Sequence, residues 1–495
     1  MKRSAGIIMP ISSLPSPYGI GTFGKAAKSF VDFLANAKQT YWQILPLGPT
    51  GYGDSPYQSF CSFAGNPYFI DFDELRKEGY LQKSDYADLN WGSDETRIDY
   101  GLLYMQRYIV LRKAVSKLLK ENSKQFQNFA KKEKGWLNDY ALFMAIKTKY
   151  NGLPFREWPD KLRVHDTKTL RQFMKDNREE VDFYKGIQYF FYVQWFRLKR
   201  YANKRGIRII GDLPIYVAED SVELWSDPKQ FQVTRDGNLK EVAGYPPGDP
   251  EDDGQRWGNP LYDWTAMEKD GYKWWIRRIK AQTRLYDVIR LDHFQGFSNY
   301  YAIPSSCVTA KIGKWKKGPG ISLFKAIQNE LGKVNFIVED LGMLHEDAYK
   351  LKEEAGYPGM KTLQYAFYPE NPSSEYLPHN FISNCVVYVS THDTEPIGGW
   401  FEDADSKLTD RAIEYLHLDK QEGYNWGMIR GAYAGCEVLA VAQMQDFLGL
   451  GKEARINDPG KATDNWNWRA KKIYFNRKLA NRISRMVLLY DRWHN

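Results

Sequence analysis

The sequence predicts an α/β fold, a (β/α)8 TIM barrel built from one chain of 495 residues. Eight short apolar segments recur along the chain, and most are followed by a polar or glycine-containing turn and then by a helical pattern. Continuous apolar runs are typical of parallel strands that are buried on both faces. Because strand and helix alternate eight times, the pattern indicates a barrel. A hydrophobic content of 43% is sufficient for its core.

The expected strands differ in composition and in the residues at their carboxyl ends. The first two are apolar runs rich in Ile, Leu and aromatic residues, and the third ends at Asp212. The fourth and fifth end in acidic residues, the sixth is aromatic, and the seventh leads into a Thr-His-Asp sequence. In chain order the expected strands are residues 6–9, 40–47, 207–212, 288–292, 336–339, 362–367, 386–390 and 444–448.

The spacing of these strands is uneven. Roughly 160 residues separate the second from the third, and the helical periodicity within that interval predicts a large, mainly helical insertion over residues 60–204. After the third strand, residues 216–275 are expected to form a long, loop-rich subdomain over the active site, because the Pro/Gly/acid cluster 246–254 excludes a regular element. We expect residues 1–495 to be a single catalytic barrel without a C-terminal β-domain.

Three expected strands lead to an acidic residue at the end where barrels of this type carry their active sites. Asp292 ends the fourth strand, Glu339 ends the fifth, and Asp393 follows the seventh. Side chains alternate along a strand, so Arg290 and Asp292 point to the same face. A guanidinium there would hold the Asp292 carboxylate ionised and orient it. We expect the three acids to converge in one site.

A structural explanation exists for each acid, because Asp and Glu after a strand often turn the chain or cap a helix. Three acids together, with Arg290 on the same face as one and His392 beside another, are harder to explain as caps. Asp340 is the acid that we expect to be structural. It points away from its neighbour Glu339 and precedes the segment 345–349, which it is expected to cap.

Two or three carboxylic acids at a barrel mouth indicate cleavage of a glycosidic bond. Asp292 is then the nucleophile, and Glu339 is the general acid/base, with a pKa raised by two neighbouring carboxylates. Asp393 would remain charged and stabilise an oxocarbenium-like transition state. His392 and Asp212 would hold hydroxyls of the same sugar, although a buried histidine with a satisfied hydrogen bond is an equally common explanation for His392.

Composition and charge argue against nucleic-acid-binding, secreted and membrane proteins. A net charge of +8 and a pI of 8.9 are mild for this length, and the sequence shows no nucleic-acid motif. The apolar stretch at the N-terminus is too short for a signal peptide. The sequence contains no run of about 18 apolar residues, so no membrane-spanning helix is expected. Four widely spaced cysteines indicate a reducing compartment and no zinc site, so a cytoplasmic protein is expected. These are Cys61, Cys307, Cys385 and Cys436.

The motifs resemble those of the amylomaltases, the 4-alpha-glucanotransferases or disproportionating enzymes of the alpha-amylase clan. Each motif alone is weak, but their joint order is specific, and they extend over nearly the whole chain. They include Arg-Leu-Asp-His-Phe at 290–294 and Thr-His-Asp-Thr at 391–394. The others are residues 6–16, 43–50, 54–59, 211–221, 254–260, 338–342, 454–460 and 465–469.

The resemblance implies a retaining transglycosylase that moves alpha-1,4-glucan segments through a covalent ester on Asp292. Its partners would be maltooligosaccharides, amylose or other alpha-1,4-glucans, with glucose or a glucan 4-hydroxyl as acceptor. It implies neither an organic cofactor nor a catalytic metal. The resemblance also assigns sugar contacts: Asp212, Arg290 and His392 at the cleavage point, and Tyr57, Gln255, Trp257 and Asn465 in neighbouring subsites.

The chain departs from the family pattern at three places. Glu395-Pro396 stands where smaller hydroxyl residues are expected, Asp464 stands where glycine is common, and the segment 244–250 has no aromatic directly after its double proline. Two alternative functions stay open from the sequence: a hydrolase that uses water as acceptor, and a non-catalytic glucan-binding barrel. The choice between monomer and homodimer is also open.

Overall fold

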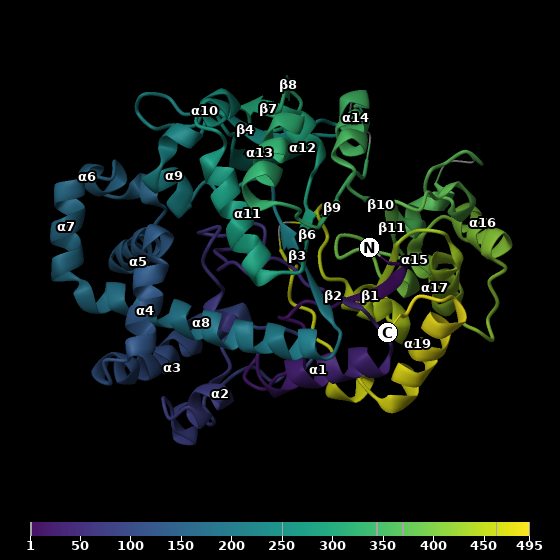
Figure 1. Cartoon of the computed structure of the whole chain (residues 1–495), viewed down its shortest axis with the longest axis horizontal. Coiled ribbons are helices and arrows are strands. Elements are labelled where there is room, and N and C mark those ends of the chain that lie inside the picture. Colours follow the sequence, from purple (N-terminus) through teal and green to yellow (C-terminus); the bar gives the residue numbers. More distant parts are fainter. Residues whose placement is uncertain (1, 250, 343–344, 369–370, 462, 495) are drawn as a thin grey trace.

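In the computed structural model, eight parallel strands close into a barrel, which confirms the expected fold class (Figure 1). The structure describes residues 2–249, 251–342, 345–368, 371–461 and 463–494. Around the barrel the strand order is β1-β12-β11-β10-β9-β6-β3-β2. The strands are β1 (Ser4–Ile8), β2 (Tyr41–Gln43), β3 (Arg208–Leu213), β6 (Val288–Leu291), β9 (Phe336–Val338), β10 (Gly359–Thr362), β11 (Cys385–Tyr388) and β12 (Leu439–Gln443).

Two of the expected strands are wrong in position. The sixth is β10 (Gly359–Thr362), and residues Leu363–Phe367 form a 3-10 helix after it. The eighth is β12 (Leu439–Gln443), and the segment expected in its place is the helix α18 (Met444–Leu448). The reason for the second error is composition. The true strand is Leu-Ala-Val-Ala-Gln, whose alanines favour helix, whereas Met-Gln-Asp-Phe-Leu contains larger apolar side chains, including the aromatic Phe447.

The strand interiors form a core of their own. Side chains from all eight strands meet inside the barrel and are almost completely excluded from water. This inner layer is a filled core, so the barrel has no open channel at its centre. Its members are Ile8, Tyr41, Ile210, Val288, Ile337, Met360, Val386, Tyr388, Leu439 and Val441.

The interval between β2 and β3 is occupied mainly by helices, which lie on one side of the barrel (Figure 1). The long helix α8 (Arg178–Lys204) returns the chain to the barrel and packs against α3 and α5. Gly186 permits this packing, because a Cβ there would lie only 2.5 Å from a methyl group of Val115. The other helices are α2 (Phe72–Lys77), α3 (Tyr100–Lys120), α4 (Lys124–Lys132), α5 (Lys134–Lys149), α6 (Asp160–Arg163) and α7 (Thr167–Asp176).

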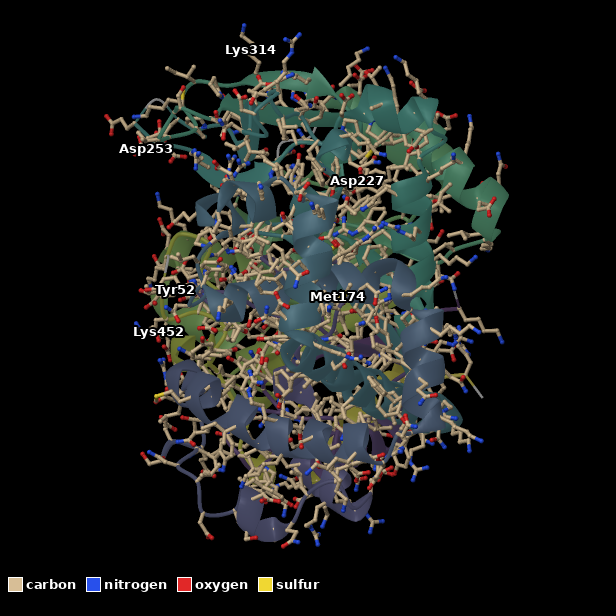
Figure 2. The ribbon with its side chains drawn as sticks, turned by 90° about the vertical axis from the view of Figure 1, so that its left-hand side faces the viewer. Tyr52, Met174, Asp227, Asp253, Lys314 and Lys452 are labelled. Atoms are coloured by element: carbon tan, nitrogen blue, oxygen red, sulfur yellow. The ribbon has the colours of Figure 1, made fainter. Side chains whose placement is uncertain are left out.

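A second, antiparallel sheet lies outside the barrel and has the order β5-β4-β7-β8. Two of its strands, β4 (Glu241–Tyr245) and β5 (Gln255–Pro260), come from the segment expected to be loop-rich. The other two are β7 (Asn299–Pro304) and β8 (Lys314–Lys317). The cluster 246–254 joins β4 to β5, and its residue Asp253 forms an ion pair with Lys311 at 2.9 Å. Asp253 and Lys314 of β8 are labelled at the same end of the molecule in Figure 2.

The remaining helices precede β2 or follow β3 in the chain. None of the helices in the described part of the chain is long and apolar enough to cross a membrane. They are α1 (Lys25–Asn36), α9 (Val222–Ser226), α10 (Trp264–Lys269), α11 (Lys273–Leu285), α12 (Gln295–Ser298), α13 (Ile321–Leu331), α14 (Glu346–Ala355), α15 (Ile397–Asp403), α16 (Ser406–Leu416), α17 (Tyr424–Ala434) and α19 (Arg477–Leu489).

Candidate active site

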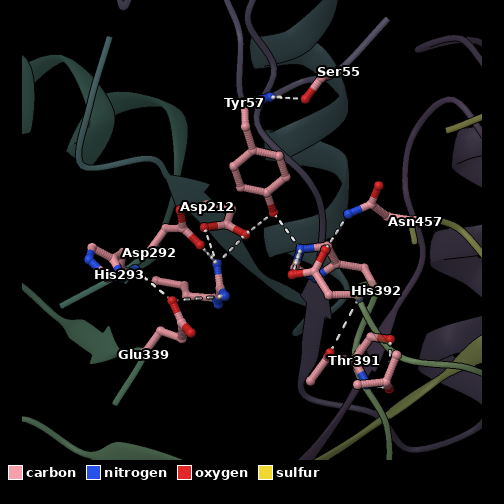
Figure 3. Close-up of polar contacts among 12 residues, drawn as sticks. Ser55, Tyr57, Asp212, Asp292, His293, Glu339, Thr391, His392 and Asn457 are labelled. Atoms are coloured by element: carbon pink, nitrogen blue, oxygen red, sulfur yellow. Dashed lines mark hydrogen bonds and ion pairs between the residues drawn. The ribbon is translucent and has the colours of Figure 1, made fainter. Parts of the chain in front are cut away.

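Arg290 is the centre of a polar site at the carboxyl end of the barrel (Figure 3). The parallel register of β3 and β6 sets Asp212 beside Arg290, and strand alternation brings Asp292 to the same face. Nη1 of Arg290 donates hydrogen bonds to both Asp212 oxygens at 2.7 Å and to Oδ1 of Asp292 at 2.9 Å. Nη2 lies 3.7 Å from Oε2 of Glu339. One buried guanidinium therefore faces three carboxylates.

The backbone fixes the direction of the Glu339 carboxylate. Glu339 directly follows β9, and its N–H donates to the carbonyl of Leu291 at 3.0 Å, so it is held against the end of β6. The backbone N–H of His293 then donates to Oε2 of Glu339 at 2.5 Å. His293 has a φ of +49°, a left-handed conformation that turns this N–H toward the carboxylate. Glu339 is thus oriented toward Asp292 by main-chain contacts.

Burial controls the protonation of this carboxylate pair. Burial raises the pKa of Asp292 to about 8, and the Arg290 guanidinium lowers it by less. Burial also raises the pKa of Glu339, so burial, and not the expected crowding by carboxylates, is the main cause. Arg290 donates a hydrogen bond to Asp292 but only approaches Glu339. We therefore assign the negative charge of the pair to Asp292 and its proton to Glu339.

Asp393 has the opposite environment on the far side of the cleft. Nε2 of His392 lies 3.1 Å from Oδ2 of Asp393, and Nδ2 of Asn457 donates to Oδ1 at 2.6 Å. Burial raises the pKa of Asp393, but His392 and Asn457 lower it by more, so that the net pKa is about 2. Burial lowers the pKa of His392, but the charge of Asp393, its hydrogen bond to the imidazole and the charge of Asp212 together raise it by more. Asp393 is therefore ionised at any pH where the protein functions.

Tyr57 connects the two sides of the site. Its hydroxyl donates to Oδ2 of Asp212 at 2.8 Å and lies 2.7 Å from Nε2 of His392. The Tyr57 and His392 rings are stacked, with centroids 5.6 Å apart and an interplanar angle of 8°. A continuous polar network thus runs from Glu339 through Arg290 and Asp212 to Asp393, as Figure 3 shows. The three acids expected to converge do so.

Solvent exposure separates the acids by position. The side chains of Asp292, Glu339 and Asp393 are 23%, 19% and 37% exposed, so each has an edge on the cleft. The Asp212 side chain is 0% exposed, and both its oxygens accept hydrogen bonds. In this structure Asp212 holds Arg290 and Tyr57 in place and presents no oxygen to the cleft.

The other residues expected to contact sugar are Gln255, Trp257 and Asn465, and they make contacts of different kinds. Trp257 packs its ring against His293, with centroids 4.8 Å apart, and its Nε1 donates to Oε1 of Gln255 at 3.0 Å. Asn465 is used differently. Its amide accepts from the N–H of Asp458 at 2.8 Å and donates to the Lys461 carbonyl at 2.8 Å, so it maintains the shape of its own loop.

Two residues that support Asp393 were not among the expected site residues. Asn457 donates to its carboxylate, and Nη2 of Arg455 donates to its carbonyl at 3.1 Å. Their one sequence signal was the loop motif 454–460, which does not identify individual residues. Arg455 also lies 3.8 Å from Glu395, one of the departures from the family pattern. The salt bridge shows that this departure connects two loops at the rim of the cleft.

The Asp464 departure also has a structural explanation. Asp464 has a φ of +64°, the left-handed region that favours glycine. Its carboxylate forms an ion pair with Arg97 at 2.6 Å and accepts from Nδ2 of Asn467 at 2.8 Å. These contacts offset the strain, so the loop retains a glycine-like backbone with an acidic residue in it.

Comparison with known proteins agrees with this geometry. A family model described as 4-alpha-glucanotransferase, glycoside hydrolase family 77, matches residues 9–474. The 4-alpha-glucanotransferase of Clostridium butyricum is 46% identical over 486 residues, covering 98% of this chain and 100% of its own. The enzyme of the same name from Thermus thermophilus is 43% identical, with 95% of each chain covered.

A solved structure described as amylomaltase from Streptococcus agalactiae in complex with acarbose aligns over 100% of both chains, with a TM-score of 0.97 and 40% identity. The amylomaltase of Corynebacterium glutamicum shares the fold, with a TM-score of 0.78 at 18% identity. The barrel, the converging acids and these matches over the whole chain lead to one conclusion: the protein belongs to the glycoside hydrolase family 77 4-alpha-glucanotransferases, and it is a 4-alpha-glucanotransferase.

Proposed function

We propose that the protein transfers alpha-1,4-glucan segments by double displacement, with Asp292 as nucleophile, Glu339 as general acid/base and Asp393 as the stabilising carboxylate. The observation that carries this assignment is the different contact that Asp292 and Glu339 make with Arg290. A nucleophile must be ionised, whereas an acid must keep its proton until the bond breaks. A direct hydrogen bond from the guanidinium favours the ionised form of Asp292.

The first half-reaction breaks the donor glucan. Asp292 attacks the anomeric carbon, Glu339 gives its proton to the glycosidic oxygen, and the departing sugar leaves with a free 4-hydroxyl. The donor segment is then an ester on Asp292, and Glu339 is ionised. Positive charge on the sugar ring in the transition state is stabilised by Asp393, whose pKa of about 2 keeps it negative.

The second half-reaction makes the new bond. Glu339 takes the proton of an acceptor 4-hydroxyl, whose oxygen attacks the anomeric carbon and displaces Asp292. Two inversions leave the alpha configuration unchanged. The proposed donors are maltooligosaccharides, amylose or related alpha-1,4-glucans, and the proposed acceptor is glucose or the end of another glucan. Membership of the family supports these substrates.

A product profile from maltotriose tests the choice of acceptor. Transfer predicts that glucose accumulates together with maltotetraose and longer chains, because each donor segment ends on another sugar. A hydrolase would instead give glucose and maltose and nothing longer than the substrate. Chromatography of the early products distinguishes them, and products that are only shortened would refute the transferase proposal.

We also propose a cytoplasmic location. All four cysteines are free in the structure, and Cys61 and Cys385 are buried. Unpaired cysteines are typical of proteins kept in a reducing compartment. Cell fractionation with antibody detection would test this, and recovery of the protein from a secreted fraction would contradict it.

A further inference from the structure

A partly exposed row of aromatic rings leads away from the general acid. Tyr245 lies 6.3 Å from His293 and 6.0 Å from Trp315, measured between ring centroids, and both contacts are perpendicular. Trp315 continues the row to His345 at 4.5 Å. Tyr245, His293 and Trp315 are partly exposed and His345 is exposed, whereas neighbouring rings such as Trp275 are completely buried.

The antiparallel sheet aligns Tyr245 with the expected sugar contacts. The register of β4 and β5 places Tyr245 opposite Gln255. Trp257 lies two residues further along β5 and therefore on the same face. On the other side of β4, Gly244 pairs with Tyr301, which pairs with Trp315, so strand alternation places Trp315 on the opposite face of the sheet from Tyr245. Gln255, Trp257 and Tyr245 thus share one face, and the Trp315 ring meets the Tyr245 ring where β4 ends.

Tyr245 also lies over the loop that follows Glu339. Its hydroxyl is 3.5 Å from the position that a Cβ would take on Gly342. The Tyr245 ring contacts that of His293, whose backbone N–H holds the Glu339 carboxylate. In Figure 3, His293 and Glu339 lie across the site from His392. Tyr245 is therefore on the side of the general acid, opposite the sugar held at Asp393.

We propose that Tyr245, whose ring is supported by a perpendicular contact with Trp315, is an acceptor-side platform for a glucose unit beyond the first of a maltooligosaccharide; this rests on the proposed roles of Asp292 and Glu339. The departing and incoming sugars must lie on the side of Glu339, because that carboxyl exchanges a proton with their 4-oxygen. Aromatic faces bind the apolar faces of pyranose rings. The segment after the double proline carries no aromatic, and Tyr245 supplies one just before it.

The test uses an alpha-maltotriosyl fluoride donor, whose small leaving group does not occupy the platform. Fluoride release is followed as a function of glucose, maltose or maltotriose added as acceptor. Tyr245→Ala is expected to raise the KM for maltotriose about 3- to 10-fold and to change the KM for glucose less than about twofold. Tyr245→Phe retains the ring and is expected to match the unmodified protein.

Controls separate recognition from a structural role. Tyr104→Ala, at an exposed aromatic of α3, is expected to change no acceptor KM. If Tyr245→Ala does not fold, Tyr245→Leu keeps part of the apolar volume without the aromatic face and gives the same readout. An unchanged KM for maltotriose, or an equal rise for glucose and maltotriose, would overturn the platform. Failure of the unmodified protein to transfer from the fluoride would instead contradict the proposed function.

Discussion

The two ends of the barrel each contain a buried arginine, and their surroundings are opposite. At the carboxyl end, Arg290 faces several carboxylates. At the amino end, Arg492 contacts one carboxylate, Glu437, and donates to main-chain carbonyls that include those of Tyr433 at 2.7 Å and Ser4 at 3.2 Å. Arg492 thus connects the last residues to the start of β1 and the end of α17.

The pKa of each arginine reflects this difference. Burial lowers the pKa of Arg290, but Asp212 and Asp292 raise it by more. Burial lowers the pKa of Arg492 by more than Glu437 raises it. The carboxyl end therefore retains an excess of negative charge for chemistry, whereas the amino end is paired and closed to solvent. Activity and stability should respond to substitutions at opposite ends.

The largest effect is expected from removing the nucleophile. Asp292→Asn leaves the shape of the site but cannot form the ester, so kcat on maltotriose should fall by about four orders of magnitude or more. Asp287→Asn is the matched control, because Asp287 precedes the same strand at its other end and accepts from the N–H of Ile209 at 2.8 Å. The control should keep kcat within about twofold. Equal activity in the two variants would contradict the mechanism.

Removing the arginine at the amino end should affect stability instead. Arg492→Met leaves the buried Glu437 carboxylate without its guanidinium donor, so the free energy of unfolding should fall by about 3–5 kcal/mol. Denaturant unfolding measures this change. The double variant Arg492→Met/Glu437→Gln should recover part of it, and the folded fraction should retain kcat/KM. A loss below about 1 kcal/mol would show that this end is not the stabilising one.

A smaller effect is expected from the amide that supports Asp393. Asn457→Ala removes a hydrogen bond to a charged acceptor, so kcat/KM should fall about 10- to 100-fold. Asn457 lowers the pKa of Asp393, so its loss should raise that pKa and move the acidic limb of the profile of kcat/KM against pH to higher pH. Asn457→Asp, which places a second carboxylate there, should be worse than alanine. Unchanged kinetics in the alanine variant would remove Asn457 from the site.

The smallest predicted effect is a gain of stability. Burial raises the pKa of both members of the carboxylate pair Asp292 and Glu339, that of Asp292 from its ordinary value near 4 to about 8, so the folded pair binds more protons than the unfolded chain between these pH values. Stability contributed by the pair therefore falls as pH rises through that window. Asp292→Asn should stabilise the fold by about 1–2 kcal/mol at pH 8 and by less at pH 5. Greater stabilisation at pH 5 would reverse the sign and contradict this assignment.

The site could be predicted from sequence where strand geometry determines it. Arg290 and Asp292 lie on the same face because alternate strand residues do, and Glu339 follows its strand directly. Asp340 was correctly expected to be structural. Its buried carboxylate accepts from Nζ of Lys352 and from the N–H of Met360, both at 2.6 Å, so it joins α14 to β10 and does not cap a helix as expected.

Features that depend on tertiary contacts could not be predicted. Asn457 lies in an irregular loop with no periodic pattern, and only the folded chain brings it to Asp393. The partial burial of Glu339 and Asp292, which dominates their pKa values, depends on packing around the cleft. The position of β12 was missed because its small residues carry a weak strand signal. Local sequence specifies the strand ends better than the loops that complete the site.

The most direct test of the central claim is the site of the covalent intermediate. Glu339→Gln should still react with alpha-maltotriosyl fluoride, because fluoride leaves without a proton, but it should release the glucan slowly. Mass spectrometry of the intact protein should show one added maltotriosyl group, and peptide mapping should locate it on Asp292. An adduct on a residue other than Asp292 would contradict the account. So would turnover without any adduct in Glu339→Gln, if the Asp292→Asn/Glu339→Gln double variant turned the fluoride over at the same rate.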